Sequence, residues 1–173
     1  MMARAVVILF LIVVAFGAAA NDEEYEVRKY GSVLRQCYAA AEGAEAKSQC
    51  LGAMSRACMS GEKGGETTLG MSRCHFGETV VWDRYLNDEY RRTMRVMRAM
   101  DEDEGETFPE FANRGASLVK AQRAWIAFRD ASCELSYAVW GAGSMRHIAG
   151  ADCVMTMTAA RTVELVRMRE TFQ

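Results

Sequence analysis

The sequence predicts an all-α protein: a disulfide-stapled bundle of about five helices, built on a long antiparallel helical hairpin. Three observations lead to this fold class. Pro109 is the only proline in the 173 residues, and the alternation of apolar and polar residues that is typical of strands is scarce. Apolar residues instead recur every three or four positions over long segments. The six cysteines form an even set, which favours disulfides in an exported chain.

The first segment is a predicted signal peptide of the Sec type. Arg4 precedes an apolar run over residues 5–16, and three consecutive alanines end at Ala20. The run is shorter than the roughly 20 residues that a membrane-spanning helix needs, and an acidic segment follows it at once. We therefore expect cleavage after Ala20, no membrane anchor after cleavage, and a periplasmic or secreted protein whose residues 21–173 form one compact unit.

The rest of the chain is divided into helices by its glycines and its proline. The predicted helices are 22–41, 44–59, 67–101, 108–139 and 151–171. Thr107 is the predicted cap of the fourth, with Pro109 in its first turn. The acidic segment 101–106 is the predicted turn of the hairpin, and the glycine-rich segments 61–66 and 141–150 are predicted surface loops.

Apolar residues at helical spacing define the faces of the two hairpin helices. The third helix carries Trp82, Leu86, Tyr90, Met94, Met97 and Met100, and the fourth carries Leu118, Ala121, Trp125, Phe128, Leu135 and Val139. Both stripes are expected to pack inside the bundle. The methionines recur on this apolar face, so core packing explains them more simply than a copper site does.

The six cysteines can pair in fifteen ways. Sequence order favours the pairs that bracket one turn or loop each: Cys37 with Cys50, Cys58 with Cys74, and Cys133 with Cys153. The alternative is metal or thiol chemistry. It is disfavoured because the sequence has no CxxC and no paired Cys/His spacing.

Polar residues also share a face on each hairpin helix. In an antiparallel hairpin, residues at equal distances from the turn face each other, so these two polar faces should meet. They are Asp83, Asn87 and Tyr90 on the third helix and Gln122, Trp125 and Arg129 on the fourth. We expect an ion pair between Asp83 and Arg129, with Asn87 near Trp125 and the Tyr90 hydroxyl near Gln122. The register could slip by one helical turn.

Arg161 occupies an apolar stripe of the last helix and needs a partner, because an unpaired buried charge is costly. Asp83, Asp130 and Glu134 are the candidates. A structural network that fixes the register of the helices is favoured over a catalytic site, since arginines close to Asp83 and Asp130 would keep both carboxylates ionised.

Three motifs in this order carry a family resemblance: WDRYLNDEYRRTM at 82–94, AQRAWIAFRDASCE at 121–134 and DCVMTMTAARTVEL at 152–165. They resemble the lysozyme-inhibitor LprI-like family of small exported bacterial domains. The resemblance covers about residues 58–166, so residues 58–173 are the predicted family domain and residues 21–57, with Cys37 and Cys50, an added leader. GAGS at 141–144 replaces the family's GGS. The family pattern is matched by Asp83, Leu86, Asn87, Tyr90, Leu118, Ala121, Gln122, Trp125, Arg129, Asp130, Cys133, Cys153, Thr158, Arg161, Glu164 and Leu165.

The resemblance implies an exported helical domain, some of whose relatives bind and inhibit lysozyme. An enzyme is disfavoured by the residues themselves: His75 and His147 lie on separate elements, and no catalytic or phosphate-binding motif is present. No cofactor is expected, and the compartment and the formal net charge of −2 exclude nucleic acid as a partner. The predicted function is a periplasmic protein that blocks lysozyme or another cell-wall hydrolase by contact. The alternative is a structural or accessory envelope protein without inhibitory activity.

Two segments are candidate contacts for such a hydrolase. The acidic segment, with Asp101, Glu102, Asp103 and Glu104, could steer a basic partner, although solvated acidic turns are common. The glycine-rich loop carries Ser144, Arg146 and His147, which could reach the carboxylates of a cleft. A disulfide-bracketed hinge is the slightly favoured interpretation of that loop.

Overall fold

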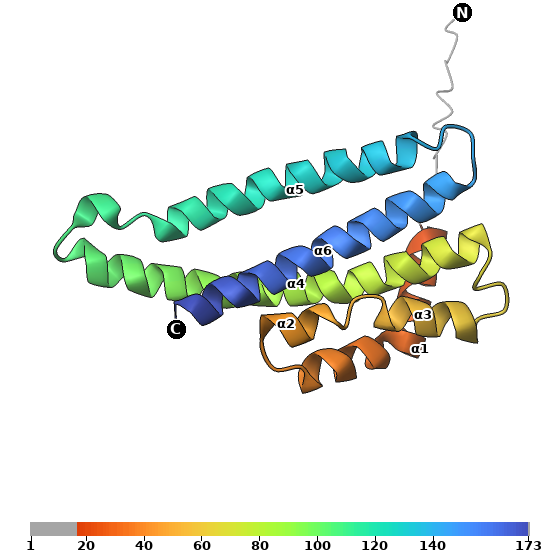
Figure 1. Cartoon of the computed structure of the whole chain (residues 1–173), viewed down its shortest axis with the longest axis horizontal. Coiled ribbons are helices and arrows are strands. Elements are labelled where there is room, and N and C mark those ends of the chain that lie inside the picture. The colour runs from red at the N-terminus through yellow and green to blue at the C-terminus, as the bar shows by residue number, and fades with distance from the viewer. Residues whose placement is uncertain (1–16, 173) are drawn as a thin grey trace, which may run out of the picture.

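The computed structural model describes residues 17–172 and shows a helical bundle (Figure 1). Its elements are α1 (Gly17–Ala40), α2 (Gly43–Ser48), α3 (Ala53–Gly61), α4 (Thr68–Gly105), the 3₁₀ helix η1 (Pro109–Phe111), α5 (Arg114–Ala138) and α6 (Met145–Thr171). The described residues contain no strand, and the all-α class is confirmed. Residues 1–16, which hold most of the predicted signal peptide, lie outside the described range, and the predicted cleavage after Ala20 falls within α1. Both the signal peptide and its cleavage stay predictions.

Helices α4 and α6 form the central pair of the bundle. Helices α1, α2 and α3 pack on one side of this pair, and α5 lies on the other (Figure 1). One core cluster joins α1 and α3 to α4 through Leu34, Met54 and Trp82, all 0 % exposed. A second cluster joins α4, α5 and α6 through Leu86, Leu118 and Leu165. None of the described helices is long and apolar enough to cross a membrane.

The three predicted disulfides are all present. Cys37–Cys50 ties α1 to the segment after α2, Cys58–Cys74 ties α3 to α4, and Cys133–Cys153 ties α5 to α6. Each bond therefore joins segments that are close in the chain, and two of the three bonds join consecutive helices.

The helix predicted over 44–59 is divided into α2 and α3 at Gly52, whose φ of 79° is open to glycine and strained for other residues. The buried Glu78 of α4 holds this break in place. Its Oε1 accepts hydrogen bonds from the Gly52 backbone N–H (2.6 Å) and from the indole of Trp82 (2.9 Å). Its Oε2 accepts one from the Ser55 N–H (2.7 Å), so the carboxylate caps the first turn of α3.

The hairpin turn also differs from its prediction. α4 continues to Gly105, Pro109 begins the short η1, and α5 begins only at Arg114. Thr107 therefore does not cap α5. The Asp101 carboxylate does so from the last turns of α4, because it accepts the backbone N–H groups of Arg114 (2.9 Å) and Gly115 (2.8 Å). The hydrogen bond from Gly115, followed by those from Arg114, holds the pKa of Asp101 below its usual range.

His75 on α4 is a buried titratable group that makes stability depend on pH. It is 9 % exposed, and its Nδ1 has no hydrogen-bond partner among the described residues. Burial lowers the pKa of His75, against the opposing effect of Asp152, whose Oδ1 lies 3.9 Å from Nδ1, and of Glu78.

The pKa of His75 in the folded chain lies below its unfolded value, so the unfolded chain binds the proton first as pH falls. Its contribution to stability is therefore complete above about pH 6.5 and is lost as pH falls below that value. We expect His75→Gln to flatten the decrease in unfolding free energy between pH 7.5 and pH 5.5, measured by urea denaturation, whereas the exposed His147→Gln keeps it. Equal slopes in all three proteins would contradict this account.

Candidate functional site

Arg161 is the centre of a polar network that joins α5 to α6. The guanidinium is 6 % exposed, and its Nε donates a hydrogen bond to Gln122 Oε1 at 2.9 Å. Its Nη1 lies 2.8 Å from the carboxylate of Glu164, one turn along α6. The ring of Trp125 lies 5.9 Å from the guanidinium carbon, which adds a cation–π contact. The predicted need for a partner is met, but by Glu164 rather than by Asp83, Asp130 or Glu134.

Arg129 extends the same network along α5. Its guanidinium lies over the Trp125 ring at 5.2 Å and pairs with the neighbouring Asp130 at 2.8 Å. Its Nη1 also donates to the Thr158 hydroxyl of α6 at 3.5 Å. The motif residues of α5 thus hold this helix on α6.

The predicted ion pair between Asp83 and Arg129 is wrong. Asp83 instead accepts a hydrogen bond from Asn87 Nδ2 (3.0 Å), and both of these α4 residues are exposed. The Gln122 side-chain oxygen accepts a hydrogen bond from Arg161, and the predicted proximity of the Tyr90 hydroxyl to Gln122 stays a prediction. The ion pair does not form because α5 packs mainly on α6. The prediction considered only the two hairpin helices and therefore left α6 out.

Only part of these two polar faces borders a pocket, while Tyr90 and Trp125 pack against the second core cluster. Asp83 and Arg84 of α4, Arg129 of α5 and Val154 of α6 line one pocket of about 350 Å³. A larger pocket of about 500 Å³ lies between α1, α4 and α6. There Glu89 accepts hydrogen bonds from Arg92 and Arg169.

The turn between α4 and α5 forms a projecting acidic tip, which we define as residues 102–111 (Figure 1). Of the acids predicted for binding, Asp101 and Glu104 are engaged within the chain, because Arg114 pairs with both. The other carboxylates of the tip make no ion pair among the described residues and are exposed: Glu102, Asp103, Glu106 and Glu110.

Two phenylalanines project from the same tip. Phe108 is 50 % exposed and Phe111 is 59 % exposed, with their ring centroids 6.3 Å apart. Neither residue is among the predicted contacts. The signal that could have found them is FPEF at 108–111, because a proline between two helices leaves the neighbouring rings no helical face to pack on.

The predicted contact loop lies at the opposite end of α5. α6 begins at Met145 rather than at 151, so Arg146 and His147 belong to its first turn. Arg146 donates to the Gly141 carbonyl (3.2 Å) and lies over the Tyr137 ring at 5.4 Å, and His147 meets the edge of that ring. These side chains are engaged in closing the loop, while Ser144 is exposed and caps nothing.

The tip and the loop are separate surfaces. The 25 residues of α5 lie between them, which at about 1.5 Å per residue is a separation of roughly 37 Å. That exceeds the span of a standard contact patch of about 800 Å² per partner. One compact interface therefore involves the tip or the loop, but not both.

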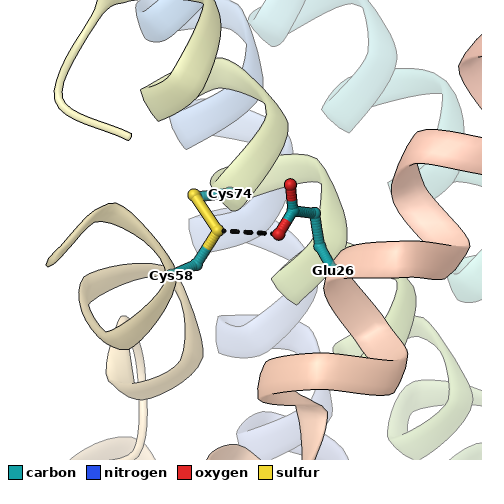
Figure 2. Close-up of side chains that lie close together, drawn as sticks. All are labelled: Glu26, Cys58 and Cys74. Carbon is teal, nitrogen blue, oxygen red and sulfur yellow. Dashed lines mark hydrogen bonds between the residues drawn. A yellow bond between two sulfur atoms is a disulfide. The ribbon is translucent and has the colours of Figure 1, made fainter. Parts of the chain in front are cut away.

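A carboxylate and two sulfurs form a buried cluster between α1, α3 and α4 (Figure 2). Glu26 Oε2 lies 3.2 Å from Cys58 Sγ, and Glu26 is 1 % exposed. Figure 2 shows Cys58 joined to Cys74, so both sulfurs are used in a disulfide and neither is a thiolate ligand. The cluster therefore serves packing, with the Arg73 guanidinium 3.9 Å from the Glu26 carboxylate.

The fold and these surfaces define a small disulfide-bonded helical protein whose exposed features suit contact with another macromolecule. A sequence model of the family described as lysozyme inhibitor LprI matches residues 58–165, and the chain belongs to this family. It is also 30 % identical over 139 residues to an uncharacterized protein of Rhizobium meliloti (strain 1021), an alignment that covers 80 % of this chain and 91 % of the relative. No solved structure matches the chain.

Proposed function

We propose that the chain is an exported binding protein that inhibits a lysozyme or a related cell-wall hydrolase, and that the acidic tip makes the contact. Family membership supports the class of partner. The observation that carries the assignment of the surface is the pair of exposed phenylalanines, Phe108 and Phe111, among four carboxylates without ion pairs in the described chain.

The chemistry of the tip fits a basic hydrolase with a cleft. Exposed carboxylates attract a basic surface and speed its association, and exposed aromatic rings are the residues that most often dominate binding energy. The rings are uncharged, so they can enter a cleft that holds two catalytic carboxylates without repulsion. The tip also projects as the convex end of the bundle, which is the shape that a concave site receives (Figure 1).

Export of the chain is part of this proposal. Three disulfides in a small domain are typical of oxidising compartments outside the cytosol. Together with the predicted signal peptide over residues 1–20, they support a periplasmic or secreted location, where a cell-wall hydrolase is present.

The test is an inhibition assay with the purified, disulfide-bonded chain against animal-type, goose-type and phage-type lysozymes. We expect at least one enzyme to be inhibited at micromolar protein, and Phe108→Ala with Phe111→Ala to weaken inhibition by about tenfold or more, equivalent to about 1.4 kcal/mol. Neutralising the four exposed acids to their amides should slow association and remove most of its dependence on salt.

Leu69→Ala is the matched control, because Leu69 is 69 % exposed and lies far from the tip at the start of α4. It should inhibit like the parent chain. If the parent chain slows none of the three lysozymes, the inhibitor function is wrong for this protein. If it inhibits but the tip variants inhibit equally well, the function stands and the assignment to the tip is wrong.

A further inference from the structure

Helix α5 has an exposed apolar stripe that no described part of the chain covers. Its members are spaced by three and four residues, as in the seam of a coiled coil. Its three large side chains, Phe128, Leu135 and Val139, are 64 %, 64 % and 69 % exposed. The members are Ala121, Ala124, Phe128, Ala131, Leu135 and Ala138, and Val139 extends the stripe four residues after Leu135, just past the end of α5; all are exposed and none is charged.

This stripe lies on a different face of α5 from the one that packs on the bundle. The packed face carries Leu118, Gln122, Trp125, Arg129 and Cys133, which contact the second core cluster or α6. Val119, on the flank opposite the stripe, packs toward α4. The sequence prediction combined residues of both faces into one stripe, and the structure separates them.

Two opposite charges border the apolar stripe on one side. Lys120 and Glu134 lie two heptads apart, where a coiled coil places the charges that select a partner. Both are exposed, and neither makes an ion pair within the described chain. Ala127 occupies the same border position halfway between them, so the arrangement has one charge of each sign at equal distances from its centre.

We propose that the stripe is an association surface for a second copy of this chain, with the two α5 helices packed antiparallel around a two-fold axis near residues 126–127. In that register the phenyl ring of Phe128 of one copy packs on the small Ala124 of the other, and Ala121 packs on Ala131. Lys120 of each copy then faces Glu134 of the other. An interface of this kind closes on itself, as symmetric dimers require.

The pattern favours a second copy over a basic hydrolase as the occupant. A basic partner would place positive charge opposite Lys120. In the antiparallel pair, Lys120 of each copy faces Glu134 of the other, so opposite charges meet at two symmetric places. Small residues opposite a large ring also let the two helices approach closely. In this register the C-terminal end of the second copy's α5 lies beside the N-terminal end of α5, next to the tip, so dimerisation and hydrolase binding are tested by separate measurements.

Sedimentation velocity of the purified, disulfide-bonded chain in the micromolar range tests this proposal. We expect a dimer, and we expect Phe128→Ser to weaken the dimer by about a hundredfold or more, as for loss of a central anchor. Leu69→Ser is the control for general surface hydrophobicity, since Leu69 is equally exposed on α4. It should leave the dimer intact. Far-UV circular dichroism confirms that each variant is folded.

A charge exchange tests the register itself. Lys120→Glu alone and Glu134→Lys alone each place like charges together twice, so each variant should dimerise about tenfold more weakly than the parent. An equimolar mixture of the two variants restores opposite charges at both places and should form a dimer of parental affinity. A parent chain that is monomeric throughout the range overturns the proposal. The proposal is also overturned if Phe128→Ser leaves the dimer affinity unchanged, or if the mixture dimerises as weakly as each variant alone.

Discussion

Replacing Glu78 with alanine is expected to destabilise the folded chain by about 3 to 5 kcal/mol. The carboxylate is 0 % exposed and accepts hydrogen bonds from two backbone N–H groups at the start of α3 and from the Trp82 indole. Alanine would leave these three donors unsatisfied in the protein interior and would also remove the cap of α3. Urea denaturation followed by the fluorescence of the tryptophans measures the change.

Glu66→Ala is the control, because Glu66 is exposed in the turn before α4. It should change stability by less than about 0.5 kcal/mol. Glu78→Ala should also expose the N-terminal turn of α3 to faster amide exchange than the rest of the core. A Glu78→Ala protein as stable as the Glu66→Ala protein would show that water replaces the carboxylate at no cost, and would contradict the capping role.

Removal of the Cys133–Cys153 disulfide is the second large perturbation. We expect the double variant Cys133→Ser with Cys153→Ser to lose about 2 to 4 kcal/mol, as for a native disulfide in a small exported domain. The loss should be concentrated in the second half of α5. That half is held to the bundle by the disulfide and by the network around Arg129, while its outer stripe packs on nothing in the described chain.

Amide hydrogen exchange locates this effect. Protection should fall over residues 129–138 and should be retained in α4, whose contacts are mainly with α6 and α1. The contrary result is uniform loss of protection along the chain, which would mean that α5 and the central pair unfold as one unit. Melting temperatures of the two oxidised proteins give the overall change in stability.

Much of the fold was predictable because it depends on local patterns. The scarcity of proline and the helical spacing of Trp82, Leu86 and Met94 predict α4, and these three residues are buried. The order of the cysteines predicts all three disulfides, since each pair joins segments that are close in the chain. These features require no knowledge of which helices that are distant in sequence pack together.

The errors in the candidate site come from such distant packing. The prediction placed Asp83 opposite Arg129 because it assumed that only α4 and α5 determine the register. In the structure the packed face of α5 lies mainly on α6. Apolar periodicity likewise predicted that Phe128 and Leu135 are covered. Periodicity reports that a face is apolar, but it does not report whether the partner belongs to the same chain.

The buried carboxylates of the chain were missed for a related reason. Glu26, Glu78 and Glu89 are each at most 2 % exposed, and each has its main contacts in an element remote in sequence or separated by a loop. Nothing in the residue types distinguishes them from the exposed glutamates of the same helices. Packing of α1, α3 and α6 against α4 brings much of their surroundings from other elements: Gly52 and Ser55 to Glu78, and Tyr38 and Arg169 to Glu89.

The order of the disulfides has a consequence for how the chain becomes oxidised. The first cysteine pairs with the second, the third with the fourth and the fifth with the sixth, so no closed loop contains a cysteine of another pair. A chain that emerges from its N-terminus can therefore complete each crosslink before the next pair arrives. Of the fifteen pairings of six cysteines, this one alone lets oxidation proceed as three successive and independent events, with no earlier bond reopened for a later one.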